Sequence, residues 1–195
     1  MKLILATNNK HKIYEIKKII GDYFPNIVSM NDVGLNIDIE ETGTTFKENA
    51  FIKAEIISRM TGMVALADDS GLAVDFLNGA PGVFSARYAG EEHDDEKNID
   101  KLLTVMKNVT DRKAYFITVL AMVYPDGRKF TAEGKTFGEI TAERKGQGGF
   151  GYDPIFYSYE LNKTFGESTD EEKNSVSHRK KALENLKTVL SGLDL

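Results

Sequence analysis

Residues 3–21 read LILATNNKHKIYEIKKIIG, and this stretch contains the local patterns that decide the fold. Residues 3–6 form a short apolar run, which is typical of a buried strand. Residues 7–10 are polar and indicate a turn. From Ile13 onward isoleucines recur at helical spacing, and Gly21 is suited to end the helix. A strand, a polar turn and a helix in this order predict the beginning of an α/β fold.

The later helices are predicted by capping residues and apolar spacing. Thr45 and Glu48 have the spacing of a capping box, so a helix is expected from residue 45 to about residue 60, before Gly62. Apolar residues at helical spacing predict a third helix around residues 99–106. A second capping-box candidate, Thr169 with Glu172, is expected to open one last helix that reaches Leu190.

The remaining strands favour a mixed sheet. Residues 63–67 form a second buried-type strand, with residues 68–71 expected at its carboxyl end. Residues 114–124 predict a long strand, and residues 129–132 and 135–141 predict return strands in an antiparallel section. A length of 195 residues is that of one domain. We therefore expect a single α/β domain over residues 1–195, with a mixed β-sheet and flanking helices.

The composition is that of an ordinary globular protein, with 41% hydrophobic and 28% charged residues. The chain has no Cys, which excludes a disulfide framework, a Cys-ligated zinc and a thiol nucleophile, and fits a reducing cytosol. A net charge of −5 argues against nucleic acid as the main partner, because such binding draws on an excess of Lys and Arg. The apolar start is too short for a signal peptide or a membrane span. We expect a cytoplasmic protein with no nucleic-acid or membrane partner.

Residues 7–12 are the first candidate site. A strand-to-helix turn directs unpaired backbone N–H groups and the positive end of the helix dipole toward one point, which favours an anion such as phosphate. Lys10 and Lys12 add positive charge. The turn lacks the glycine-rich Walker pattern, so a solvated basic turn is the alternative interpretation.

Acidic pairs form the second candidate site: Asp68 with Asp69, and Glu40 with Glu41 before the second helix. Ligands of α/β sheets lie beyond the carboxyl ends of strands, and Mg²⁺ takes carboxylate oxygens while keeping several waters. The alternative is that residues 68–71 are ordinary turn residues.

The third candidate, Lys53, lies on or beside the core-facing side of the second helix and must reach a partner, either solvent or a phosphate.

The fourth candidate combines residues 148–154 with residues 173–179. The glycines beside Phe150 allow a flat ligand to approach closely, and an aromatic face can stack on a base. His178 and Arg179 can donate hydrogen bonds to an oxygen acceptor. Taken alone, each segment favours a simpler interpretation, namely a glycine turn and a helix that begins with basic residues.

Together and in this order, these segments resemble one family, the inosine triphosphate pyrophosphatases, also called non-canonical purine NTP or XTP/dITP pyrophosphatases. The resemblance covers nearly the whole chain and rests on six motifs: ATNNKHK at 6–12, EETG with Phe46 and ENA at 40–50, ADDSGL at 67–72, GAPG with SARY at 79–88, GGFGYDP at 148–154, and EK with SHR at 172–179. One departure is Asn8, where many members have glycine. Asn tolerates the same left-handed backbone.

The resemblance implies a Mg²⁺-dependent enzyme that hydrolyses deaminated purine nucleoside triphosphates such as ITP, dITP and XTP to the monophosphate and pyrophosphate. It also implies an elongated mixed β-sheet with flanking helices and two lobes around a central cleft, in a homodimer. It assigns Glu40 and Asp69 to the metal and Asp69 to catalysis as the proton acceptor, with Asp68 either a further ligand or a support for Asp69. It carries over the remaining residues as substrate contacts: Thr7, Asn8, Asn9, Lys10, His11, Lys12, Lys53, Ser70, Phe150, Gly151, Tyr152, Asp153, Lys173, His178 and Arg179.

Base selection can be argued from hydrogen bonding. Hypoxanthine and xanthine carry an oxygen at position 6 where adenine carries an amino group, so donors on His178 or Arg179 would pair with the former only. A buried donor left without a partner costs about 1–3 kcal/mol. Guanine shares the 6-oxygen, so its exclusion requires a contact near position 2. Two rival interpretations stay open: a Maf-like nucleotide pyrophosphatase that prefers pyrimidine or modified nucleotides, and a nucleotide sensor that binds without turnover.

Overall fold

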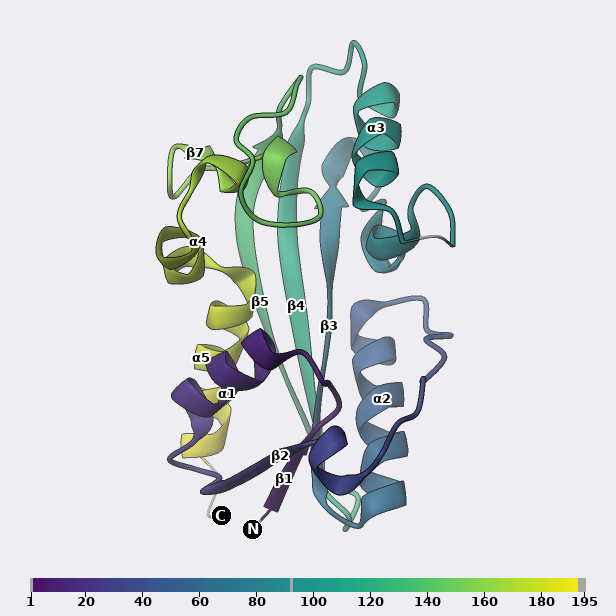
Figure 1. Cartoon of the computed structure of the whole chain (residues 1–195), viewed down its shortest axis with the longest axis vertical. Coiled ribbons are helices and arrows are strands. Elements are labelled where there is room, and N and C mark those ends of the chain that lie inside the picture. The colour runs from purple at the N-terminus through teal and green to yellow at the C-terminus, as the bar shows by residue number, and fades with distance from the viewer. Residues whose placement is uncertain (1, 92, 193–195) are drawn as a thin grey trace. The chain divides into compact units, whose positions relative to one another are not determined.

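The computed structural model describes residues 2–91 and 93–192, in which helices and strands alternate before an antiparallel section (Figure 1). The strands are β1 (Lys2–Leu5), β2 (Asn26–Ser29), β3 (Val64–Val74), β4 (Lys113–Val123), β5 (Lys129–Ile140), β6 (Phe156–Ser158) and β7 (Lys163–Thr164). The helices are α1 (Lys10–Ile20), α2 (Phe46–Thr61), α3 (Asp95–Val105), α4 (Asp170–Val176) and α5 (His178–Ser191). The α/β class predicted from the sequence is confirmed. None of the helices in the described residues has the length and apolar character needed to cross a membrane.

The described strands form one mixed sheet in the order β2-β1-β3-β4-β5-β6-β7. β1 is parallel to both β2 and β3, and Leu5 is level with Ser29 on one side and Leu66 on the other. β5 pairs antiparallel with β6, and β6 pairs antiparallel with β7. The predicted mixed sheet is therefore confirmed.

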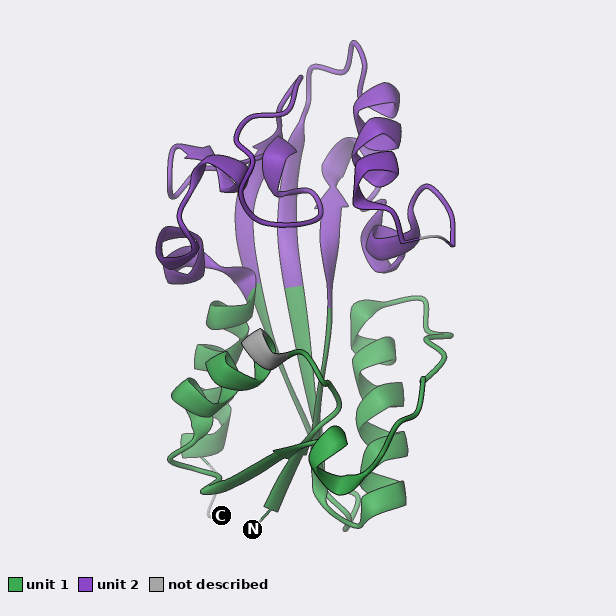
Figure 2. Ribbon diagram, in the orientation of Figure 1, with its two compact units in different colours: residues 1–69, 118–134, 179–195 green, residues 70–117, 135–178 purple. Residues whose placement is uncertain are grey.

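The chain separates into two compact units, which Figure 2 draws in different colours. Unit 1 comprises residues 1–69, 118–134 and 179–195, and unit 2 comprises residues 70–117 and 135–178. Strands β3, β4 and β5 each contribute residues to both units. The expectations of a single domain over residues 1–195 and of two lobes around a cleft stay predictions.

In unit 1 the pleat of each strand divides its side chains between two faces. Leu3 and Leu5 belong to a core cluster with α1 and α5, whereas Ile4 belongs to a second cluster with α2. β3 alternates in the same way, with Leu66 in the first cluster and Ala65 in the second. Helices α1 and α5 therefore cover one face of the sheet in this unit, and α2 covers the other.

The core of unit 2 is rich in aromatic side chains. Phe116 of β4 packs against Phe156 of β6 and against Phe165, with ring centroids 4.7 and 5.9 Å apart. Ile99 of α3 belongs to the same cluster, which confirms the predicted third helix. Ile155 is also fully buried there, so the end of the glycine-rich segment is anchored in this core.

Helix ends follow the local sequence rules. Thr45 Oγ1 accepts a hydrogen bond from the Glu48 N–H, and the Glu48 carboxylate accepts one from the Thr45 N–H, so α2 begins with the predicted capping box. α2 ends where Gly62 takes a left-handed conformation with φ of 64°. Thr169 and Glu172 form the second predicted capping box, at the start of α4.

Three predicted boundaries were wrong. β3 continues through residues 68–71 to Val74, so these residues neither follow the strand nor form a turn. Although Asp and Ser disfavour strands, β3 lies beside β4, which is also 11 residues long, and sheet pairing overrides the local preference. The two return strands are one continuous β5. The last helix is divided into α4 and α5, because Ser177 between them is extended, with ψ of 145°.

Candidate functional site

The acidic pair Asp68 and Asp69 lies in the middle of β3, just past the end of its parallel neighbour β1. The pairing of β1 with β3 ends at Leu66, whose carbonyl accepts the Ala6 N–H at 2.8 Å. Both acidic residues are buried, with exposed fractions of 7% and 8%. Because successive strand residues point to opposite faces, Asp68 faces α1 and α5 while Asp69 faces α2. The two carboxylates therefore have different neighbours.

On the first face, Asp68 pairs with Lys12 of α1, whose Nζ donates to Asp68 Oδ2 at 2.7 Å. Burial of the carboxyl raises its pKa, but the positive charges of Lys12, Arg179 and Lys53 outweigh burial and hold the pKa of Asp68 well below its usual range. Asp68 is therefore ionised, and it holds the ammonium group of Lys12 beside the strand.

On the second face, Asp69 contacts two residues of α2. Asn49 Nδ2 donates to Asp69 Oδ2 at 3.2 Å, and Lys53 Nζ lies 3.9 Å from Asp69 Oδ1. Lys53 Nζ also donates to Glu41 Oε1 at 2.5 Å. Lys53 thus links two carboxylates, a kind of partner that the sequence analysis did not consider, and its binding of phosphate stays a prediction.

The segment before α2 is fixed by a contact with the first turn of that helix. The Gly43 N–H donates to Asn49 Oδ1 at 2.8 Å, and Asn49 is fully buried. A Cβ on residue 43 would lie 2.6 Å from Asn49 Oδ1, so only glycine allows this approach. Sequence reasoning included Asn49 in a motif but gave it no role. Its acidic partner lies 20 residues away, beyond the reach of any local pattern.

Glu40, the predicted metal ligand, is exposed, whereas its neighbour Glu41 is half-buried and contacts Lys53. The role of Glu40 stays a prediction. The observed contacts favour Glu41 as the carboxylate linked through Lys53 to Asp69. In the part of the chain that the structure describes, no group of three or more acidic or histidine side chains is arranged to hold a metal ion.

Asparagine side chains hold the polar turn after β1. Asn9 Oδ1 accepts the Lys12 N–H at 3.2 Å, in the manner of a helix cap. Asn8 Oδ1 accepts the Asn31 N–H at 3.0 Å, and Thr7 Oγ1 accepts the Asn9 N–H at 3.2 Å. The predicted sequence of strand, turn and helix is confirmed, and Lys12 projects from the first turn of α1.

Helices α1 and α5 bring a further charged pair together. Arg179 Nη1 lies 3.5 Å from Glu15 Oε2, and both side chains are largely buried. Burial raises the pKa of Asp68, and the charge of Arg179 opposes this, second only to the charge of Lys12. The side chains of Lys10 and His11, in the first turn of α1, lie outside the described part of the structure.

In unit 2 the glycine-rich segment presents the ring of Phe150, which is 69% exposed. Lys173 Nζ lies 4.2 Å from the ring centroid in a cation–π contact. Lys173 also pairs with the buried carboxylate of Asp153, which accepts the Phe150 N–H at 2.8 Å. A Cβ on Gly149 would overlap that carboxylate, so glycine is required there. Asp153 therefore fixes both the loop backbone and the lysine that lies over Phe150.

Two other predicted contacts of this segment have partners within unit 2. The Tyr152 hydroxyl donates to the Ser85 carbonyl at 2.8 Å, and burial raises its pKa, so the phenol stays protonated. The Gly151 N–H donates to Asp95 Oδ2 at 2.9 Å. Burial also raises the pKa of the Asp153 carboxyl, although the charge of Lys173 opposes this.

His178 and Ser70 lie at the limits of unit 2. The His178 ring stacks on Phe116, with centroids 5.1 Å apart and planes 15° apart, at the first residue of α5. Ser70 is half-buried in β3, directly after Asp69. Their predicted substrate contacts are not tested by these positions.

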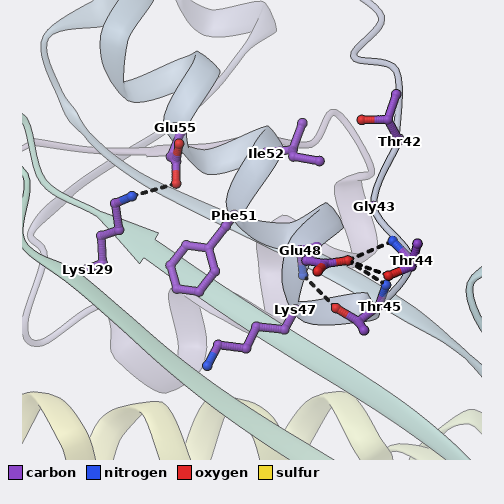
Figure 3. Close-up of a pocket in the computed structure, with 10 residues that line it drawn as sticks. All are labelled: Thr42, Gly43, Thr44, Thr45, Lys47, Glu48, Phe51, Ile52, Glu55 and Lys129. Atoms are coloured by element: carbon purple, nitrogen blue, oxygen red, sulfur yellow. Dashed lines mark hydrogen bonds and ion pairs between the residues drawn. The ribbon is translucent and has the colours of Figure 1, made fainter.

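A pocket of about 810 Å³ lies beside the first turns of α2 (Figure 3). Its lining includes Lys47, Phe51 and Lys129, and Lys129 Nζ pairs with Glu55 at 2.7 Å. The residues that line it include none of the predicted site residues. Asp69 therefore does not line the pocket, although Gly43, which does, contacts Asn49.

These arrangements have clear chemical capacities. Unit 1 holds buried carboxylates and lysines in contact, which are groups that bind phosphate and cations and accept protons. Unit 2 presents an exposed aromatic ring held by a lysine and a buried carboxylate, which is a surface suited to stacking. These are the capacities needed to bind and cleave a nucleotide.

Comparison with known proteins agrees with this chemistry. The model of the Ham1 family matches residues 3–189. A dITP/XTP pyrophosphatase of Clostridium perfringens is 52% identical, with 98% of each chain covered. The solved structure of a Staphylococcus aureus Ham1 protein is similar with a TM-score of 0.92 and 43% identity, covering 98% of this chain and 99% of that one. A nucleoside-triphosphatase, or dITP/XTP pyrophosphatase, of Mycobacterium abscessus gives a TM-score of 0.82 at 38% identity, covering 100% of both chains. These similarities extend along nearly the whole chain.

Proposed function

Because the chain belongs to the Ham1 family, we propose that it is a hydrolase that cleaves non-canonical purine nucleoside triphosphates such as dITP, XTP and ITP to the monophosphate and pyrophosphate. The relatives named dITP/XTP pyrophosphatase support this substrate class. The proposed cellular role is removal of deaminated purine nucleotides from the nucleotide pool.

The observation that carries this proposal is the charged network on the two faces of β3. On one face Lys53 lies within ion-pair distance of Asp69 and Glu41, and on the other Lys12 pairs with Asp68. Lysines held by buried carboxylates are suited to bind the phosphates of a nucleoside triphosphate. They would also stabilise the negative charge that develops on the departing pyrophosphate.

The proposal includes Mg²⁺ because the donor set fits this ion. Asp69 and Glu41 both approach Lys53 Nζ. Mg²⁺ commonly takes one or two protein carboxylates, and waters and substrate phosphates complete its coordination, so this mode needs no third acidic ligand. Asp69 would hold the ion together with Glu41, or with Glu40 as the family resemblance implies. When bound, the ion would supply positive charge to the phosphates.

In the proposed reaction, water attacks the α-phosphorus and the bond to the bridging oxygen of the β-phosphate breaks. Asp69 accepts the proton that the attacking water loses. Lys53 and Lys12 bind phosphate oxygens, together with the turn at residues 7–12. Asp68 acts indirectly, because its ion pair sets the position of Lys12. This role differs from the two left open for Asp68, a further metal ligand or a support for Asp69.

Base recognition is the finer part of the proposal. The exposed ring of Phe150 would stack on the purine, which contributes about 1–3 kcal/mol, with Lys173 and Asp153 holding the ring in place. Donors on His178 and Arg179 would pair with the 6-oxygen and remain unpaired against adenine. Contacts of Ser70, Gly151 and Tyr152 with substrate, a homodimeric state and a cytoplasmic location remain predictions.

The experiment that tests the function is pyrophosphate release from ITP, XTP, dITP, GTP, ATP and dTTP, each with Mg²⁺ and with EDTA. We expect turnover that favours ITP, XTP and dITP and that EDTA abolishes. A preference for dTTP would instead support the Maf-like interpretation. Tight ITP binding without product would support a sensor.

A further inference from the structure

We infer that Asn49 is a positioning residue that holds the carboxylate of Asp69 in the orientation in which it accepts the proton from water. This inference rests on the proposed function, because it concerns the residue that we assign as proton acceptor. Nothing in the resemblance or in the comparisons assigns a role to Asn49.

The orientation of the Asn49 amide follows from its two partners. A backbone N–H can only donate, so the atom that faces the Gly43 N–H at 2.8 Å must be the amide oxygen. The amide nitrogen is then left to face Asp69 Oδ2, at 3.2 Å. Because the Gly43 N–H holds the amide oxygen, the Asn49 side chain presents its NH₂ donor to Asp69 and never an acceptor.

Burial makes this orientation permanent. Asn49 is fully buried, and an amide that rotated would place its NH₂ against the Gly43 N–H and its oxygen against a carboxylate. Both contacts would then be repulsive and without water to relieve them. Asn49 also belongs to α2, and its backbone N–H donates to the Thr45 carbonyl at 3.1 Å. The donor that Asp69 receives thus comes from a rigid element.

The consequence for Asp69 is a carboxylate restrained about its final torsion, because rotation would break the hydrogen bond from Asn49. With Oδ2 held by the amide, Oδ1 lies on the side of Lys53 Nζ, 3.9 Å away. Lys53 is one of the groups to which we assign phosphate binding, so the contact with Asn49 determines how the Asp69 carboxylate faces this lysine. A proton acceptor works only when its acceptor atom has the correct position and direction.

The test uses two variants that disturb this contact and one that does not. Asn49→Asp has nearly the same shape and keeps an acceptor for the Gly43 N–H. In its ionised form it cannot donate to Asp69, and it places a second negative charge beside that carboxylate. Gly43→Ala leaves Asn49 chemically intact and adds a Cβ that would meet its amide oxygen at 2.6 Å. Thr45→Ala is the matched control, because it removes the cap of the same helix without touching Asp69.

We expect Asn49→Asp to lower kcat on ITP about 10- to 100-fold, the range typical of residues that orient a reacting group, with KM changed less than about threefold. Gly43→Ala should lower kcat in the same direction with a similarly small change in KM, so the inference stays testable if Asn49→Asp does not fold. Thr45→Ala should lower the melting temperature and leave kcat unchanged.

The outcomes separate this inference from the proposed function. If the wild-type protein releases no pyrophosphate from any triphosphate, both are overturned. If the wild type is active and either variant at positions 43 or 49 keeps wild-type kcat, only the role of Asn49 is overturned. It is overturned equally if Thr45→Ala loses kcat to the same extent, because a general loosening of α2 would then explain the effect.

Discussion

Replacing Phe150 with alanine separates binding of the base from the stability of the fold. The ring is 69% exposed, so its loss removes little buried surface and should change the free energy of unfolding by no more than about 0.5 kcal/mol. The cation–π contact with Lys173 adds about 0.5–1 kcal/mol at an exposed site. For a chain of this length, 1 kcal/mol corresponds to about 2–4 °C, so we expect the melting temperature to fall by less than about 6 °C.

The effect on substrate binding should be larger. Stacking on an aromatic ring contributes about 1–3 kcal/mol per base, which corresponds to roughly a 5- to 150-fold loss of affinity. We expect Phe150→Ala to raise KM for ITP and dITP by a factor in this range, with a smaller effect on kcat. Steady-state kinetics and a thermal melt measure the two quantities on the same sample.

Phe137→Ala is the matched control, because Phe137 is also an exposed aromatic residue of unit 2, 56% exposed, and is not among the predicted site residues. It should leave KM unchanged. The reasoning is refuted if Phe150→Ala has wild-type KM for both nucleotides, or if both variants raise KM equally.

Three further predictions concern unit 1. If Glu41 rather than Glu40 is the second carboxylate that binds Mg²⁺, Glu41→Gln should lower kcat/KM and raise the Mg²⁺ concentration needed for the half-maximal rate. Glu40→Gln should stay near wild type in both quantities. The reverse ranking of the two variants in a Mg²⁺ titration would identify Glu40 as the ligand. Asp68→Asn breaks a charged hydrogen bond from Lys12 and should lower the free energy of unfolding by about 1.5–3 kcal/mol. Urea denaturation measures this change. An unchanged urea midpoint would show that the ion pair between Lys12 and Asp68 does not stabilise the fold. Hydrogen bonds from the Thr44 side chain and backbone lower the pKa of Glu48 in the folded protein, so the ionised Glu48 stabilises the fold above the ordinary Glu pKa of about 4.3. This stabilisation is lost as the pH falls below that value and through the folded-state pKa. Between about pH 5 and pH 3, Glu48→Gln should therefore lose less free energy of unfolding than the wild type, and equal losses would argue against this role of Glu48.

The sequence predicted those parts of the fold that local chemistry determines. The capping boxes at Thr45 and Thr169 need only four consecutive residues, and both form as expected. The extent of β3 could not be predicted, because Asp68 and Asp69 have poor strand propensity and are extended only through pairing with a neighbouring strand. The break at Ser177 was missed for a related reason, since the apolar spacing on either side of it fits one continuous helix.

In the candidate site, sequence identified the charged residues but not their connections. The spacing of Lys53 showed that it must reach a partner, yet its partners Glu41 and Asp69 depend on how the preceding loop folds. Glu40 and Glu41 are equivalent as letters in a sequence, and only the folded loop makes one exposed and the other half-buried. Asn49 was missed because a buried asparagine has no periodic signature, and both of its contacts are tertiary.

The discontinuous make-up of unit 1 has a consequence for synthesis in the cell. Leu3 and Leu5 emerge from the ribosome well before Leu120 of β4 and Leu183 of α5, which belong to the core cluster that buries them. At about 5–20 residues per second, the first strand waits on the order of ten seconds for α5 to be translated. During that interval its apolar side chains are available to chaperones and to other nascent chains. Synthesis that stops before α5 leaves this surface uncovered, so truncated products of this chain should aggregate or be degraded.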